Sequence, residues 1–380
     1  MSIGKRAAAW LSRLVQIPSV TPAQAGARSG IPGEQEIARQ VAAWFHSLGG
    51  QVEQEEVLSD RPNIYGLWPG QTGAWVAVDV HLDTVGVEGM SGDPFSGEIR
   101  DGRVWGRGAA DTKASLGVIL ALLEHIQESG QTPIPSLLIG ATVDEETGST
   151  GAPAFAAWQR RQPFQVMQIV VAEPTECIPV YGHRGAARFE LTFHGVSAHT
   201  SQPERGKNAI NAAARTIVAY MEEEARLQTL PPAAVGRPTL TVSIIHGGSG
   251  LNVVPDRCTV QVDRRVVDGE HAAAVTDALY EMAQQAGGLP VELRRLREMN
   301  AFLQSPDSPW IRQLAEWSER APQVAPYGTN AWAYADLPAE CVVIGPGSIA
   351  QAHSAEEWVE IAQLEKLAMI YARWWGIALE

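Results

Sequence analysis

The chain has 380 residues, enough for two domains, and a formal net charge of −14 at pH 7, from 29 Lys and Arg against 43 Asp and Glu. This acidic balance argues against nucleic acid and anionic lipid as partners, because both carry negative charge. No apolar run reaches the roughly 18 residues of a membrane span, and three scattered cysteines offer no disulfide framework, so we expect a cytoplasmic protein.

Helices and strands alternate along the first half of the chain. The periodicity of apolar residues predicts helices over 3–15, 34–48 and 112–127 and strands over 75–80, 136–143 and 166–172. These strands are nearly continuous in Val, Ile, Leu and Ala, which is typical of a parallel or mixed sheet covered by helices on both faces. The pattern therefore indicates the α/β class, with a mixed, mainly parallel sheet.

The pattern changes near residue 184. It predicts a strand over 188–193, a helix over 208–228, strands over 240–245 and 258–266, a helix over 270–285 and a strand over 290–296. This β-α-β-β-α-β order can stand as a small α+β domain of its own. The first pattern then resumes, with a strand over 341–344 and a helix over 356–374. We expect residues 1–183 and 297–380 to form one domain, into which a second domain of residues 184–296 is inserted.

Four predicted strands of the larger domain lead to side chains that can bind a metal ion. His81 and Asp83 follow the first strand, Glu145 and Glu146 the second, Glu173 the third and His353 the fourth, and Asp111 precedes a predicted helix. Taken singly, each is more often a cap or a solvated turn residue than a ligand. Sites in open α/β sheets form at the carboxyl ends of strands, so we expect these side chains to converge. Their carboxylates would then repel one another unless divalent cations were bound, and this donor set suits zinc, with cobalt or manganese as substitutes.

Five short segments contain these residues: His81-Leu-Asp-Thr, Gly106-Arg-Gly-Ala-Ala-Asp-Thr-Lys, Asp144-Glu-Glu-Thr-Gly, Ala172-Glu-Pro-Thr and Gln351-Ala-His. In this order they resemble the family of dinuclear zinc hydrolases that includes acetylornithine deacetylase, succinyl-diaminopimelate desuccinylase, aminoacylase and carboxypeptidase G. The resemblance runs from about residue 81 to the last predicted helix, and it includes an inserted lid domain at the place where the pattern changes. It implies two Zn²⁺ per chain, with Co²⁺ or Mn²⁺ able to substitute.

The resemblance also implies a role for each side chain of the larger domain. Asp111 would bridge the two metal ions, His81 and Glu173 would complete one site, Glu146 and His353 the other, Glu145 would be the general base, and Asp83 would orient His81.

The inserted domain has three further candidates. The resemblance implies that His199, in Gly195-Val-Ser-Ala-His, reaches the active site of a neighbouring subunit, so that the chain is a homodimer through its lid domain. It implies that Asn252 and Arg265 bind the carboxylate of the substrate, a task that suits a bidentate guanidinium. Arg264 is the alternative to its neighbour Arg265.

These features together predict a cytoplasmic zinc-dependent amidohydrolase. We expect it to remove an N-acyl group of acetyl or succinyl type from a small amino acid, as acetylornithine deacetylase or succinyl-diaminopimelate desuccinylase does, with metal-activated water as the nucleophile. One alternative is a metallo-carboxypeptidase or dipeptidase of the same family. A more distant one is a metal-free binding protein, which the loss of a ligand or of Glu145 would favour, and all of these residues are present.

Overall fold

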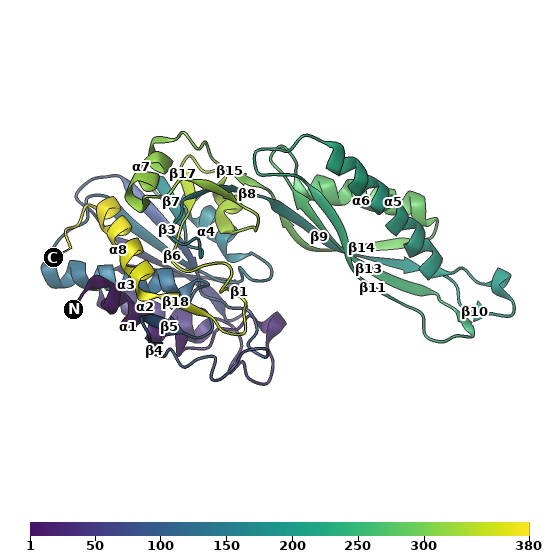
Figure 1. Ribbon diagram of the computed structural model, residues 1–380, viewed down its shortest axis with the longest axis horizontal. Coiled ribbons are helices and arrows are strands. Elements are labelled where there is room, and N and C mark those ends of the chain that lie inside the picture. The colour runs from purple at the N-terminus through teal and green to yellow at the C-terminus, as the bar shows by residue number, and fades with distance from the viewer. Residues whose placement is uncertain (380) are drawn as a thin grey trace. The chain divides into compact units, whose positions relative to one another are not determined.

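The computed structural model describes residues 1–379, which divide into two compact units (Figure 1). The larger unit contains Met1–Tyr181, Gln304–Gln323 and the described residues from Thr329 onward, and the smaller contains Gly182–Leu303 and Val324–Gly328. The boundary expected at 296/297 falls inside strand β14 (Val291–Met299), whose last residues are mostly charged and give no apolar signal. The smaller unit therefore continues to Leu303.

A nine-stranded mixed sheet has the order β1-β2-β6-β3-β7-β17-β8-β15, with β16 beside β8. Its strands are β1 (Gln51–Leu58), β2 (Arg61–Trp68), β3 (Trp75–His81), β6 (Ser136–Thr142), β7 (Val166–Val171), β8 (Val180–His183), β15 (Phe302–Leu303), β16 (Gln323–Ala325) and β17 (Glu340–Val343). The central strands β6, β3, β7 and β17 are parallel, so their carboxyl ends lie at the same edge. The predicted α/β class with a mixed sheet is confirmed.

Helices cover both faces of the central strands. The larger unit contains α1 (Ile3–Val15), α2 (Gln35–Ser47), α3 (Lys113–Ser129), α4 (Gly151–Arg160), α7 (Pro309–Ser318) and α8 (Ile361–Trp375), with 3₁₀ turns η1 (Pro22–Gln24) and η3 (Asn330–Tyr334). On one face, alternate residues of β3 such as Val76 and Val78 join the core formed with α1, α3 and α8. On the other face, the ring of Phe155 in α4 occupies the space that a Cβ at Gly140 would need. The sheet is thus buried on both sides, as its continuous apolar strands predict.

The last predicted helix begins later than expected. Residues 358–360 form strand β18 (Trp358–Glu360), which pairs with β5 (Arg103–Trp105), and β4 (Ile99–Arg100) completes a three-stranded sheet. The helical expectation over 356–360 is wrong because Glu357 and Val359 are both buried at alternate positions, the spacing of one side of an extended segment rather than of a helix face. Helix α8 starts only at Ile361.

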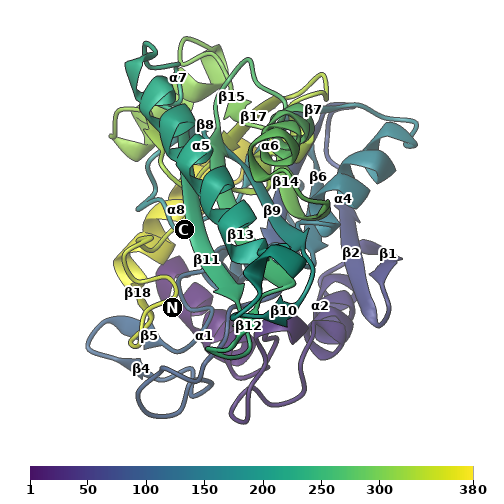
Figure 2. The ribbon, with the colours of Figure 1, turned by 90° about the vertical axis from the view of Figure 1, so that its right-hand side faces the viewer.

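The smaller unit is a four-stranded antiparallel sheet with two helices on one face (Figure 2). Its main elements are β9 (Gly185–His194), α5 (Ala209–Thr229), β11 (Thr239–Gly247), β13 (Arg257–Val266), α6 (Ala272–Gly287) and β14 (Val291–Met299), and its short elements are β10 (Ala198–His199), η2 (Pro203–Arg205) and β12 (Val253–Val254). The sheet order β11-β13-β9-β14 leaves β11 and β14 at its edges. Among residues 1–379, no helix is both long enough and apolar enough to cross a membrane.

Candidate metal centre

The edge formed by the carboxyl ends of the parallel strands brings the candidate ligands of the larger unit together. Asp111, in the loop before α3, lies between two imidazoles: its Oδ1 is 3.1 Å from Nε2 of His81 and its Oδ2 is 3.3 Å from Nε2 of His353. His81 is the last residue of β3, whereas His353 comes from the loop between β17 and β18. One carboxylate therefore contacts a different histidine with each of its oxygens, the arrangement expected of a residue that bridges two cations.

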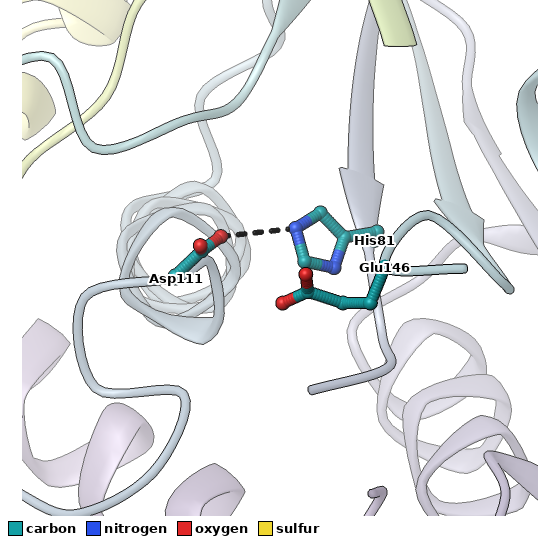
Figure 3. Close-up of side chains that lie close together, drawn as sticks. All are labelled: His81, Asp111 and Glu146. Atoms are coloured by element: carbon teal, nitrogen blue, oxygen red, sulfur yellow. Dashed lines mark hydrogen bonds and ion pairs between the residues drawn. The ribbon is translucent and has the colours of Figure 1, made fainter. Parts of the chain in front are cut away.

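Glu146 completes a tight cluster with these residues. Its two carboxylate oxygens are each 3.2 Å from Nε2 of His353, and one ligand atom each from His81, Asp111 and Glu146 lie within 4.8 Å of one another (Figure 3). Burial and the charge of Asp111 raise the pKa of Glu146 to about 8. The side chain of Glu146 thus points into the cluster, where the negative charge of Asp111 disfavours ionisation of the Glu146 carboxyl group.

Glu173 is a further buried acid at this edge. It follows β7 and is only 5% exposed. Burial, and to a smaller extent repulsion from Asp111, raises the pKa of Glu173 well above the usual value. Its backbone rests on the loop after β17: the N–H of Cys177 donates to Gly345 O at 2.8 Å, and a Cβ at Gly345 would lie 2.5 Å from Glu173 O. The Gly345 turn therefore supports Glu173.

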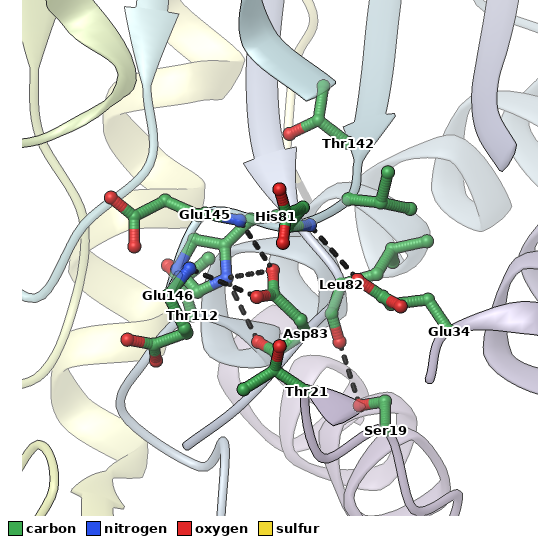
Figure 4. A network of polar contacts seen from close by, with 12 residues as sticks. Ser19, Thr21, Glu34, His81, Leu82, Asp83, Thr112, Thr142, Glu145 and Glu146 are labelled. Carbon is green, nitrogen blue, oxygen red and sulfur yellow. Dashed lines mark hydrogen bonds and ion pairs between the residues drawn. The ribbon is translucent and has the colours of Figure 1, made fainter. Parts of the chain in front are cut away.

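Asp83 connects His81 to the loop that contains Glu145 and Glu146 (Figure 4). It is fully buried, and its Oδ1 and Oδ2 accept the backbone N–H groups of Glu145 and Glu146, each at 3.0 Å. Nδ1 of His81 lies 3.0 Å from the carbonyl oxygen of Asp83 and 3.5 Å from its Oδ1. These acceptors favour a proton on Nδ1, which leaves Nε2 with a lone pair directed at the cluster.

A second buried carboxylate supports the same loop and was not found from the sequence. Oε1 of Glu34 accepts the N–H of Asp144 at 3.0 Å, and Arg61 binds Glu34 with two nitrogens, at 2.6 and 2.7 Å. Arg61 also contacts Asp144 Oδ1 at 3.1 Å. The backbone N–H groups of 144, 145 and 146 thus all donate to buried carboxylates. No sequence signal marks Glu34, because it stands at the start of an amphipathic helix where an exposed acid is the usual finding.

The electrostatics of the cluster fit divalent cations. Burial alone would lower the pKa of His81, but hydrogen bonds to Asp111 and Asp83 outweigh it and raise that pKa well above its usual value. Hydrogen bonds to Asp111 and Glu146 raise the pKa of His353 to about 10. Both imidazoles thus favour the protonated form because carboxylates surround them. A bound cation would compensate the same negative charge. Imidazole nitrogens with carboxylate oxygens suit zinc, cobalt or manganese.

The three candidates of the smaller unit form two groups. His199 lies in β10, which pairs with β12, and the carbonyl oxygen of Asn252 accepts the N–H of Thr200 at 3.1 Å, so His199 and Asn252 belong to one local structure. Arg265 lies in β13, where its Nε is 3.2 Å from Asp263. Burial and the nearby Arg188 lower its pKa. The alternative, Arg264, is 3% exposed and bound to Glu270. Both guanidinium groups thus contact an acid, and that of Arg265 is the more exposed, with 26% of its side chain exposed against 4% for Arg264.

Comparisons with known proteins show the family to which the chain belongs. The model of peptidase family M20/M25/M40 matches residues 77–376. The chain is 30% identical to acetylornithine deacetylase of Myxococcus xanthus, over 87% of this chain and 89% of that protein. Among solved structures, an M20 family metallo-carboxypeptidase from Sulfolobus solfataricus superposes with a TM-score of 0.77, at 17% identity over 95% of this chain and 96% of that one. A dinuclear metal binding peptidase of the M20 family from Bacillus subtilis gives 0.66, at 16% identity over 99% of both chains. The chain belongs to peptidase family M20/M25/M40, a family of metal-dependent enzymes, and it is a hydrolase of amide C–N bonds.

Proposed function

We propose that this enzyme removes an N-acyl group, of acetyl or succinyl type, from a small amino acid, with two divalent cations bound per chain. The observation that carries the proposal is Asp111 between His81 and His353, with Glu173 and Glu146 as further acids. The similarity to acetylornithine deacetylase over nearly the whole of both chains supports a deacylase.

The residues present define how the cations would be held. Asp111 would bridge them, His81 and Glu173 would complete one site, and Glu146 and His353 the other. When bound, zinc ions supply the positive charge that polarises the amide carbonyl and lowers the pKa of a water molecule. Asp83 would keep the Nε2 atom of His81 directed at the first site, through the contacts at Nδ1.

Glu145 is the proposed general base. Its backbone N–H is fixed by Asp83 Oδ1, and the side chain belongs to the residue directly before the ligand Glu146. A carboxylate at this place takes a proton from the attacking water and returns it to the departing amine, which would otherwise leave as an unstable anion.

The smaller unit would contribute recognition of the substrate. Arg265 and Asn252 are proposed to bind the carboxylate of the amino acid, because a guanidinium and an amide offer converging N–H donors. His199 is proposed to stabilise the developing oxyanion in a neighbouring subunit. An assembly through strand β11 is supported by its position at the sheet edge, where Ile244 and Ile245 are 41% and 48% exposed. We also propose a cytoplasmic location, in keeping with three free, buried cysteines.

A substrate panel tests this function. Purified protein loaded with Zn²⁺ or Co²⁺ is assayed on N-acetyl and N-succinyl amino acids beside dipeptides, as wild type, as Glu145→Gln and as Glu128→Gln. Glu128 is an exposed acid of α3 whose side chain is 54% exposed, so its variant should match wild type. Glu145→Gln should bind both metal ions and lose activity by about 10²–10⁴-fold.

Each other outcome has a distinct meaning. Full activity of Glu145→Gln would refute the assigned base, and fewer than two metal ions per wild-type chain would refute the dinuclear centre. Hydrolysis of dipeptides alone would identify a carboxypeptidase or dipeptidase instead, and a chain without any metal or activity would be a binding protein.

A further inference from the structure

A buried ion pair lies directly behind the candidate metal centre. Arg107 and Glu357 bind each other through Nη1 and Oε2, and their side chains are 4% and 0% exposed. Arg107 belongs to the loop that contains Asp111, whereas Glu357 lies 250 residues later, just before β18. Replacing such pairs by apolar residues is often neutral or stabilising, so burial alone does not explain this one.

Glu357 holds the backbone of the bridging residue. Its Oε1 accepts the N–H of Ala110 at 2.9 Å and the N–H of Asp111 at 3.1 Å, while Oε2 is used by Arg107. The main chain adds a further link, since the N–H of Gly106 donates to Glu357 O at 3.0 Å. The position of Asp111 is therefore defined by a side chain from the far end of the sequence.

Arg107 extends the same connection to two more loops. Its Nη2 donates to Gly86 O at 3.0 Å and to Ser354 O at 3.4 Å. Gly86 follows the His81–Asp83 segment, and Ser354 directly follows His353. A single ion pair thus bonds to the loop that follows His81 and to the two loops that contain Asp111 and His353.

The two sides of the centre depend on this pair to different degrees. His81 is fixed by β3, where it pairs with Thr142, and Glu173 is fixed by the Gly345 turn. His353 lies in a loop, its side chain is 50% exposed, and the neighbouring Ser354 carbonyl is bound by Arg107. Loss of the pair should therefore move His353 and Asp111 apart before it disturbs His81.

We propose that Arg107 and Glu357 are positioning residues that set the place of Asp111 relative to His353, and that the cation held by Glu146 and His353 depends on them more than the cation held by His81 and Glu173. This inference rests on the proposed dinuclear centre. A guanidinium and a carboxylate are both required, because the pair must accept two N–H groups on one side and donate to two carbonyl groups on the other.

Glu357→Gln is the most informative variant, because glutamine has nearly the same size and shape as glutamate. The carboxamide can present its oxygen to the N–H groups of Ala110 and Asp111 or to Arg107, but its NH₂ group then faces a donor on the remaining side. Glu360→Gln is the matched control. Glu360 lies three residues along, pairs with Arg103 across β18 and β5, and has a side chain that is 44% exposed.

The test is a Co²⁺ titration of the metal-free proteins, followed by absorption spectroscopy. Wild type and Glu360→Gln should bind two equivalents, and Glu357→Gln should bind the first normally and the second at least about tenfold more weakly, in line with other partners of metal ligands. In the fully loaded enzymes, kcat should fall in Glu357→Gln with KM changed less. Arg107→Lys, which keeps the charge but reaches fewer acceptors, should show a smaller effect in the same direction.

Several results would overturn the inference. Two equivalents bound by Glu357→Gln with wild-type affinities would do so, as would equal weakening of both. Loss of the folded state in both the Glu357 and the Arg107 variants, measured by circular dichroism of the metal-free proteins, would assign the pair to stability alone. Fewer than two equivalents in wild type would instead refute the proposed dinuclear centre itself.

Discussion

The turn at Gly345 offers a direct way to disturb one side of the centre. In Gly345→Ala, the new Cβ would lie 2.5 Å from Glu173 O and 2.9 Å from Ser115 Oγ. Relief of the first contact to 3.0 Å requires a displacement of 0.5 Å, the difference between these two values. A metal site tolerates about 0.2 Å in its ligand distances, so this displacement of Glu173 should weaken the cation held by His81 and Glu173.

The same contact sets the expected loss of stability. Overpacking of a well-packed site costs typically about 1–3 kcal/mol. For a unit of this size, about 1 kcal/mol corresponds to roughly 2–4 °C in Tm, so the metal-free variant should melt about 2–12 °C below wild type. Gly73→Ala is the control, because a Cβ at Gly73 meets nothing within 4 Å.

The assay combines thermal melting of the metal-free proteins with the Co²⁺ titration. Gly345→Ala should bind one equivalent of Co²⁺ normally and the other weakly. The absorption spectrum of its remaining Co²⁺ should differ from that of Glu357→Gln, because Gly345→Ala weakens the cation held by His81 and Glu173, whereas Glu357→Gln weakens the cation held by Glu146 and His353. Unchanged Tm and two wild-type affinities in Gly345→Ala would show that the turn yields without moving Glu173, and the reasoning would fail.

Three further predictions concern the same molecule. Asp83→Asn should lower metal affinity by about 10–100-fold, because each Asp83 oxygen accepts one loop N–H and the carboxamide would turn its NH₂ group toward one of these donors; chelator competition measures this, and unaltered affinity would contradict the role of Asp83. Burial lowers the pKa of His183 from its ordinary value of about 6.5 to about 4, so the unfolded chain binds a proton first as pH falls, and stability is lost between about pH 6.5 and 4 by about 3 kcal/mol. His183→Gln should remove that part of the slope in urea unfolding, and parallel curves for the two proteins would speak against it. Removal of metal by a chelator should abolish activity and lower Tm, since a ligand at 100 times its Kd stabilises by about 2.7 kcal/mol per site; a Tm indifferent to metal would argue against a bound cation in the folded state.

The ligands at strand ends could be predicted because two signals coincide there. The apolar runs before His81, Glu145 and Glu173 are continuous, so the strands and their ends are readable, and parallel strands place those ends at one edge. The hairpin of β1 and β2 was not predicted, because β1 is rich in Glu and Gln and largely exposed. Its pairing depends on β2, which is almost wholly buried, rather than on any periodicity of its own.

Apart from Asp83, which the family resemblance implies, the residues that support the ligands could not be predicted. Glu34, Arg107 and Glu357 are buried and the side chain of Arg61 is only 12% exposed, whereas a charged residue in a sequence usually indicates an exposed face. Their burial depends on partners far away in the chain, so only tertiary structure reveals it. The same holds for residues 356–360, where the contacts of Glu357 override a pattern that favours a helix.

The strands at which the chain enters and leaves the smaller unit are direct neighbours. Gly182 and His183 of β8 pair antiparallel with Leu303 and Phe302 of β15. Antiparallel neighbours can be joined by a hairpin turn of about two residues. The intervening segment is therefore modular: a short turn could replace it, and the resulting chain would retain every candidate ligand from His81 to His353. The proposed recognition residues and the candidate metal ligands thus occupy separable stretches of the chain.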